Sequence, residues 1–343
     1  MKKFAILSLI ALFMSLSTTL MVRAEQLAGA KAAIICIPGL TQSSKTYDRL
    51  TQSMAPHGIM VKAIDVKGFA NAIGEDGKQE QINFNATMDL VKDTADQLKK
   101  DNNDIPVFVL GESTGGTFAM LIADKYPGYI DGIICSAPTW KVTGMKKVAV
   151  YQILDMTVLR SRKRGLAVGS VFNRVTDDKK LRKELAQLES RRQRFTVVEA
   201  MKFLMFTKRL PLIANSIDKM PVLFVQGMKD KLSQPTETAL LFKNIATSRK
   251  TFIVDSDAEH LIYEEGQFSE NLLLSLRDWV LNAAGGATPL TPKGVLFAKD
   301  NMAKKKAGQV DKVFSAAGVI PGDSIARQQV DNVDNVSVAK FAP

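Results

Sequence analysis

Histidine and cysteine are scarce in this chain, with two residues of each type among 343. The histidines are His57 and His260, and the cysteines are Cys36 and Cys135. Because no Cys/His cluster has the spacing of a zinc site, we expect no bound metal, and no sequence motif indicates a cofactor. Any reaction that needs an imidazole base has only two candidates.

Long apolar runs are also absent, except at the N-terminus. Lys2-Lys3 opens a positive region, residues 4–22 are mostly apolar, and Val22-Arg23-Ala24 offers small residues for cleavage. This pattern predicts a secretory signal peptide over residues 1–24, and hence an exported protein, either periplasmic or secreted. The alternative is an uncleaved membrane anchor, because about 19 weakly polar residues can nearly span a bilayer.

The clearest chemical motif is Gly111-Glu112-Ser113-Thr114-Gly115, a G-x-S-x-G pentapeptide. Residues 107–110 before it form an apolar run typical of a buried parallel strand, and residues 118–126 after it favour a helix. A serine on such a sharp strand-to-helix turn exposes its hydroxyl, and the glycines let neighbouring backbones pass closely. Ser113 is therefore a candidate nucleophile.

A serine nucleophile needs a base and an acid that orients the base. His260 follows a strand-like run at residues 252–254, whereas His57 lies in an early Pro-His-Gly turn that is typical of a solvated histidine. Asp230 follows the strand-like run 221–226 and is the preferred acid. Asp255 and Asp257 are the alternatives, but they lie in the same loop as His260.

These motifs together resemble the serine α/β-hydrolases, closest to the group of monoglyceride lipases, lysophospholipases and serine aminopeptidase-like esterases. The resemblance covers about residues 32–284, and the order Ser113, Asp230, His260 is the order of that fold. The resemblance also rests on two further segments, residues 34–40 and 221–230. It implies a mostly parallel central sheet flanked by helices, with an inserted helical cap.

The resemblance also implies an oxyanion hole made by the backbone N–H groups of Leu40 and Thr114. Two positions depart from the usual pattern: Pro38-Gly39 replaces the usual His-Gly, and Glu112 stands where relatives often have histidine. Proline keeps the turn but removes an imidazole, so we expect a hole with a different support. We expect the change at Glu112 to be neutral.

The same fold places the serine-bearing strand between the strands that carry Cys36 and Cys135. With strands about 4.8 Å apart, their Cα atoms would be separated by nearly 10 Å, which is too far for a disulfide. We therefore predict two buried free thiols.

Four regions follow from the resemblance and from composition. Residues 1–24 are the signal peptide, 25–140 and 216–284 the hydrolase core, 141–215 a helical cap, and 285–343 a C-terminal extension without counterpart in the family. The strand–helix alternation stops in the cap, where we expect helices at 178–190 and 197–207 and no good strand. The extension has few aromatic residues, so we expect it to be loosely held or disordered.

The cap carries 18 Lys and Arg against 6 Asp and Glu, a net charge of +12, whereas the whole chain has +11. Apolar runs at 156–159 and 203–206 interleave with these charges. The pattern is typical of a protein that sits on an anionic membrane surface, although a solvated helical surface is the simpler alternative. Aromatic residues are not interleaved with the charges, so we expect no nucleic-acid partner.

The predicted reaction is hydrolysis of a carboxylic ester through an acyl-enzyme, with a lipid-like monoester such as a monoacylglycerol or lysophospholipid as substrate. One alternative is an aminopeptidase, which needs an acidic pocket residue to hold an N-terminal amine. Another is a non-catalytic membrane- or partner-binding protein on the same fold. The sequence gives no indication of the oligomeric state.

Overall fold

The computed structural model describes residues 29–40, 42–69, 80–141, 166–167, 174–188, 194–195, 197–287, 293–297 and 304–319. The predicted signal peptide lies outside these residues and stays a prediction. Within the described residues, no helix combines the length and the apolar character needed to cross a membrane.

A seven-stranded sheet forms the centre of the molecule, and every neighbouring pair of strands in it is parallel. Six of the strands have mostly apolar sequences, as expected for strands covered on both faces. In sheet order the seven strands are β2 (Ile59–Ala63), β1 (Ala32–Ile37), β3 (Val107–Glu112), β4 (Gly132–Ser136), β7 (Val222–Gly227), β8 (Lys250–Asp255) and β9 (Lys293–Phe297). The predicted fold class is confirmed.

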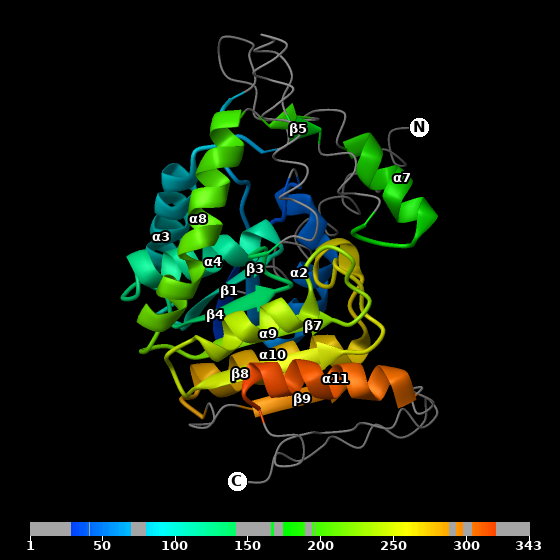
Figure 1. Ribbon diagram of the computed structural model, residues 1–343. Coiled ribbons are helices and arrows are strands. Elements are labelled where there is room, and N and C mark those ends of the chain that lie inside the picture. The colour runs from blue at the N-terminus through cyan, green and yellow to red at the C-terminus, as the bar shows by residue number, and fades with distance from the viewer. Residues whose placement is uncertain are drawn as a thin grey trace, which may run out of the picture.

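Helices cover both faces of the sheet (Figure 1). One face packs against α3 (Phe84–Asp101), α4 (Thr114–Lys125), α9 (Pro235–Lys243) and α11 (Lys304–Ala317). The other face packs against α2 (Asp48–Met54) and α10 (Glu270–Ala284). Successive β1 residues alternate between the two apolar clusters, with Ile35 in the first and Ile34 in the second. This alternation is what a strand period of two residues requires.

The two cysteines lie on either side of the serine-bearing strand. Cys36 is in β1 and Cys135 is in β4, and β3 separates these strands. Both thiols are free and buried, which confirms the prediction of two buried free thiols.

Within the predicted cap region the described elements are α7 (Lys179–Leu188), α8 (Val197–Ser216) and two short strands, β5 (Leu166–Ala167) and β6 (Arg194–Phe195). β5 and β6 pair antiparallel, so this region, where we expected no good strand, holds two strands of only two residues each. α8 is longer than predicted and runs beside α3 and α4 (Figure 1). The Phe206 ring lies 4.8 Å from that of Phe84, which ties α8 to the core.

The C-terminal extension was expected to be loosely held, and this is wrong for residues 293–297 and 304–319. β9 adds a seventh strand beside β8, and α11 packs along α9 (Figure 1). Phe314 of α11 is fully buried and meets Phe252 of β8 edge to face, with ring centroids 6.2 Å apart. The described part of this extension therefore completes one side of the hydrophobic core.

Candidate functional site

The G-x-S-x-G motif forms the sharp turn between β3 and α4. Ser113 has φ 55° and ψ −115°, a backbone conformation that non-glycine residues rarely adopt. A Cβ at Gly111 would lie 2.0 Å from the Gly115 carbonyl oxygen, and one at Gly115 would lie 2.0 Å from the Ile37 carbonyl oxygen. Both glycines are thus required by close backbone approach, and the turn points the Ser113 hydroxyl away from the sheet.

The structure brings together the three side chains that the sequence predicts as nucleophile, base and acid. The Ser113 Oγ lies 2.8 Å from His260 Nε2, and His260 Nδ1 lies 2.8 Å from Asp230 Oδ2. The side chains of His260 and Asp230 are 1% and 0% exposed. Each residue follows the carboxyl end of a different strand, so parallel strands deliver all three to one edge of the sheet.

Asp230 is held in place by three further donors. Its Oδ1 accepts the N–H groups of Leu232 and Ser233, at 2.7 and 2.8 Å, and its Oδ2 accepts the Gln226 amide at 3.0 Å. Neither alternative acid takes this position. Asp255 instead accepts two N–H groups of its own loop, and Asp257 pairs with Lys229.

The charge of Asp230 controls the titration of His260. Burial lowers the pKa of His260, but the charge and hydrogen bond of Asp230 outweigh this effect and raise the pKa above its ordinary value of 6.5. The imidazole is therefore a stronger base than a free histidine, which suits it to accept a proton from Ser113.

Thr139 is a site residue that the sequence did not single out. Its hydroxyl lies 3.0 Å from the Ser113 Oγ, and its N–H donates to the Ser113 carbonyl at 3.0 Å. Its position just after the strand β4 was the available signal, because polar residues at the carboxyl ends of parallel strands gather at one edge. Thr139 thus fixes both the backbone and the hydroxyl of Ser113.

Glu112 is the second residue whose importance the sequence did not indicate. It is fully buried, and its carboxyl accepts the N–H groups of Ile262 and Tyr263, both at 2.7 Å, and the Ser136 hydroxyl at 2.9 Å. Burial raises the pKa of Glu112 to about 7, against the opposing effect of these three hydrogen bonds. We expected the glutamate at this position to be neutral, but its side chain links the serine turn to the histidine loop.

Replacing Glu112 by leucine is expected to lower the free energy of unfolding by roughly 2–6 kcal/mol. The change leaves two buried N–H groups without an acceptor, at roughly 1–3 kcal/mol each. Urea unfolding at pH 6, where the wild-type carboxyl is mostly uncharged, measures the effect. Glu270→Leu, at the exposed first residue of α10, is the matched control and should change stability by less than about 0.5 kcal/mol. A similarly small effect at Glu112 would contradict this role.

The two predicted oxyanion-hole residues both lie close to Ser113. Thr114 is the first residue of α4, so its N–H is one of the helix N-terminal N–H groups that no carbonyl of the same helix accepts, and it lies next to the serine. Leu40 lies within the turn after β1, which is closed by the bond from the Gln42 N–H to the Gly39 carbonyl at 3.1 Å. A Cβ on Gly39 would lie 3.5 Å from the Ser113 Cβ, so this turn passes directly beside the serine.

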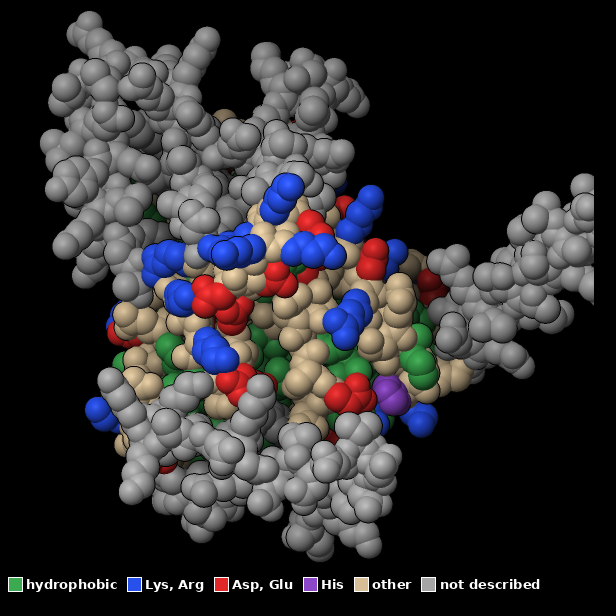
Figure 2. Space-filling view, turned by 90° about the vertical axis from the view of Figure 1, so that its right-hand side faces the viewer, with side chains coloured by type: hydrophobic (Ala, Val, Ile, Leu, Met, Phe, Trp, Pro, Cys, Tyr) green, Lys and Arg blue, Asp and Glu red, His purple; other side chains and the backbone are tan. Residues whose placement is uncertain are grey.

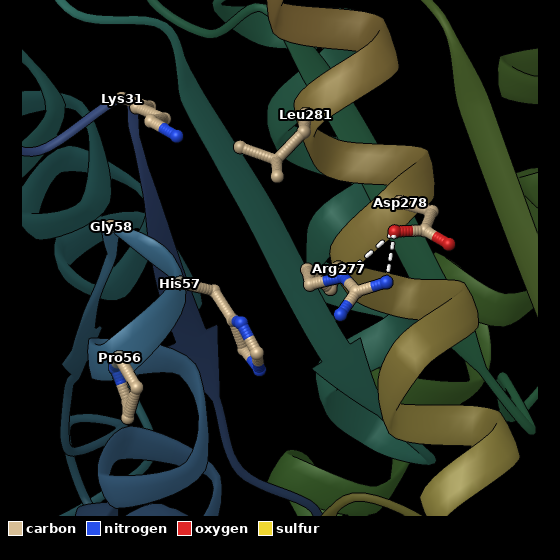
Figure 3. A pocket seen from close by; sticks show the side chains of 7 residues that line it. All are labelled: Lys31, Pro56, His57, Gly58, Arg277, Asp278 and Leu281. Carbon is tan, nitrogen blue, oxygen red and sulfur yellow. Dashed lines mark hydrogen bonds and ion pairs between the residues drawn. The ribbon is translucent and has the colours of Figure 1, made fainter. Parts of the chain in front are cut away.

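A separate surface pocket lies between η2 (Ala55–His57) and the second half of α10 (Figure 3). Lys31 and Gly58, which line it, precede β1 and β2, so the pocket is at the amino ends of the strands. The candidate site is at their carboxyl ends. His57 lines this pocket, half-buried and with the Arg277–Asp278 ion pair across from it, and takes no part in the serine site. Among the described residues no group of His, Cys, Asp and Glu could hold a metal ion.

Comparison with known proteins identifies the family of this chain. The model of one protein family, described as serine aminopeptidase S33, matches residues 28–267. The chain belongs to this family. Among its relatives, monoglyceride lipase from Homo sapiens is 24% identical over 267 residues, which cover 76% of this chain and 86% of the relative. Monoglyceride lipase from Mus musculus is 23% identical over 265 residues, with the same shares of the two chains.

Solved structures of other proteins share the fold. A soluble variant of monoglyceride lipase from Saccharomyces cerevisiae, in complex with a substrate analog, superimposes with a TM-score of 0.61 at 18% identity. The match covers 76% of this chain and 88% of that one. Monoacylglycerol lipase from Paleococcus ferrophilus gives 0.60 at 20% identity, covering 73% and 94%. This S33 member is thus an α/β-hydrolase of the monoglyceride lipase-like group, a hydrolase of the lipase or esterase type.

Proposed function

We propose that this S33 member is a serine esterase that cleaves a lipid-like monoester through an acyl-enzyme. The observation that carries the proposal is the continuous hydrogen-bonded chain from Ser113 through His260 to Asp230, with 2.8 Å at both links. This is the arrangement that activates a serine hydroxyl, and binding alone does not require it. That point argues against a non-catalytic role.

In the proposed acylation, the Ser113 Oγ attacks the ester carbonyl carbon while its proton passes to His260 Nε2. The oxyanion that forms accepts hydrogen bonds from the N–H groups of Leu40 and Thr114. His260 then returns the proton to the departing alcohol, which leaves the acyl group esterified to Ser113. In deacylation, His260 takes a proton from water, the water oxygen attacks the acyl carbon, and the carboxylic acid leaves as Ser113 regains its proton.

The substrate class rests on the relatives and on the apolar, basic cap. Two mammalian relatives and two solved neighbours are monoglyceride or monoacylglycerol lipases by name. We therefore expect hydrolysis of p-nitrophenyl esters to increase with acyl length from acetate to a medium chain, with a burst of one p-nitrophenol per enzyme if deacylation is slow. Activity on the acetate alone would contradict a lipid-like substrate.

The family description also names an aminopeptidase, which is the second candidate. Such an enzyme needs a carboxylate that faces the substrate amine. The buried acids next to the described site, Glu112 and Glu264, instead accept backbone N–H groups. Assay with amino-acid p-nitroanilides separates the candidates: hydrolysis of these and not of the esters would favour the aminopeptidase.

We also propose that α8 touches an anionic lipid surface. Four apolar side chains on this helix are 55–73% exposed, and the cations Lys202, Lys208 and Arg209 beside them are exposed too. The apolar residues are Val198, Met201, Met205 and Leu212. By contrast, acidic and basic side chains are interspersed on the described part of the face in Figure 2. A combination of apolar contact and positive charge favours anionic membranes.

Binding to vesicles is expected to increase with the phosphatidylglycerol content and to decrease with salt. The variant Met201→Ser/Met205→Ser/Leu212→Ser should bind at least about tenfold more weakly, because it removes the exposed apolar contacts. Co-sedimentation with the vesicles measures this. Leu240→Ser removes a 39% exposed leucine from α9 and should bind like the wild type. Binding that depends on neither lipid charge nor salt would refute the proposal.

A further inference from the structure

Glu264 is a buried acid in the histidine loop, four residues after His260. It begins the short helix η4 (Glu264–Gly266) and is 0% exposed. Its Oε1 accepts the N–H of Gly39 at 2.5 Å, across 225 positions of the sequence. Burial of a carboxyl group without a hydrogen-bond partner costs free energy, so buried carboxyl groups are normally hydrogen-bonded. The contact between Glu264 and Gly39 is therefore a specific feature of the fold.

The partner of Glu264 lies in the turn that carries the proposed oxyanion donor. Gly39 directly precedes Leu40, and the turn is closed by the bond from the Gln42 N–H to the Gly39 carbonyl. A hydrogen bond on the Gly39 N–H limits rotation at this residue, and that rotation determines where the next N–H points. Pro38, which precedes this glycine, has neither an N–H nor a polar side chain that could support the turn by a hydrogen bond.

Two buried carboxyl groups thus connect the three loops of the site. Glu112, from the serine turn, holds the N–H groups of Ile262 and Tyr263 in the histidine loop. Glu264, next along that loop, holds Gly39 in the oxyanion turn. The end of β1 before this turn is fixed as well, because the Tyr47 hydroxyl donates to the Ile37 carbonyl at 3.1 Å. The position of the oxyanion turn relative to Ser113 therefore depends on Glu264.

We propose that Glu264 is a positioning residue for the oxyanion hole, whose carboxyl oxygen holds the Gly39 N–H and so directs the Leu40 N–H toward the substrate. The catalytic part of this inference rests on the proposed esterase function. The contact requires an acceptor oxygen and not a negative charge. Glutamine retains that oxygen, whereas leucine has a similar size and lacks it.

The test compares Glu264→Gln with Glu264→Leu in the full chain, using p-nitrophenyl esters. We expect the glutamine variant to retain kcat within about threefold. The leucine variant should lose about 10²–10³ in kcat, the usual effect of losing one oxyanion donor, with KM changed less than about threefold. Glu265→Leu, at the neighbouring half-buried position, is the matched control and should keep the wild-type kcat.

A second readout reports on the contact without any substrate. With ¹³C-carbonyl proline and ¹⁵N glycine, only the three Pro-Gly peptides give a filtered amide signal, at Gly39, Gly128 and Gly322. We expect the Gly39 amide to exchange slowly with solvent in the wild type and in Glu264→Gln, and rapidly in Glu264→Leu. Gly128 serves as the internal reference and should not change.

Three results would overturn the proposal. They are equal kcat values for the glutamine and leucine variants, a leucine variant with a raised KM and an unchanged kcat, or fast exchange of the Gly39 amide in the wild type. The last of these needs no variant, so it applies even if Glu264→Leu does not fold. A wild type that hydrolyses no ester but protects Gly39 would refute the esterase function and the catalytic role, and leave the Glu264 contact intact.

Discussion

Ser113→Ala is expected to lower kcat for ester hydrolysis by a factor on the order of 10⁶, because the nucleophile is lost while the rest of the site remains. His260 keeps its bond to Asp230, and the two oxyanion N–H groups belong to the backbone. A residual rate of roughly 10³–10⁴ over water is expected from binding and the oxyanion hole. Steady-state assay with a medium-chain p-nitrophenyl ester measures the loss.

The control for this variant is Ser315→Ala, which removes an exposed hydroxyl from α11 on the outside of the core. It should retain the wild-type kcat, and both variants should keep the far-ultraviolet circular dichroism of the wild type. A Ser113→Ala protein that retains more than about a hundredth of the wild-type kcat would show that another group attacks the substrate.

The second large effect is expected from Asp230→Asn, which should lower kcat by a factor of about 10⁴. The reason lies in the partners of the carboxyl group. Since Oδ1 accepts the N–H groups of Leu232 and Ser233, the asparagine oxygen must take that place. Its NH₂ group then faces the N–H at His260 Nδ1. Both groups are donors, so they cannot form a hydrogen bond with each other. The imidazole must move its proton to Nε2 and can no longer accept one from Ser113.

The pH profile provides an independent check on Asp230. In the wild type the rate should fall as the pH drops through the His260 pKa, which Asp230 holds above 6.5. Removing the carboxylate charge removes the main effect that raises this pKa, so the acidic limb of kcat/KM should move to lower pH in Asp230→Asn. Asp257→Asn, in the histidine loop but paired with Lys229, should keep the wild-type rate and limb. An unshifted limb in Asp230→Asn would contradict the assignment.

Much of the core was predictable because its strands are continuous apolar runs. β1, β3, β4 and β7 are buried along their whole length, so their sequences show little polar interruption. The serine turn was predictable for a different reason, since only glycine fits at Gly111 and Gly115. The positions of Asp230 and His260 followed from strand ends in a parallel sheet.

The C-terminal extension was misjudged because its charges conceal a regular pattern. Val310, Val313, Phe314 and Ala317 are spaced as on one face of a helix, and all four are buried in α11. The run of lysines at 304–306 and the scarcity of aromatic residues suggested a loosely held segment. β9 was harder to predict, because a five-residue edge strand with a lysine and a glycine has a weak apolar signal.

The roles of Glu112 and Glu264 could not be predicted from the sequence. Each accepts backbone N–H groups, and a backbone N–H leaves no trace in the identity of the residue that carries it. The partners are also remote, at 150 positions for Glu112 and Ile262 and 225 for Glu264 and Gly39. Only the folded chain shows that these acids connect the loops of the site.

The most direct test of the central claim is the site of covalent modification by a fluorophosphonate probe. We predict stoichiometric labelling of the wild type, with the probe found by peptide mass spectrometry on Ser113 and no labelling of Ser113→Ala. Labelling should also be lost in His260→Ala, because the hydroxyl then has no base. An unlabelled wild type, or a probe attached to another residue, would contradict the assignment of Ser113 as the activated nucleophile.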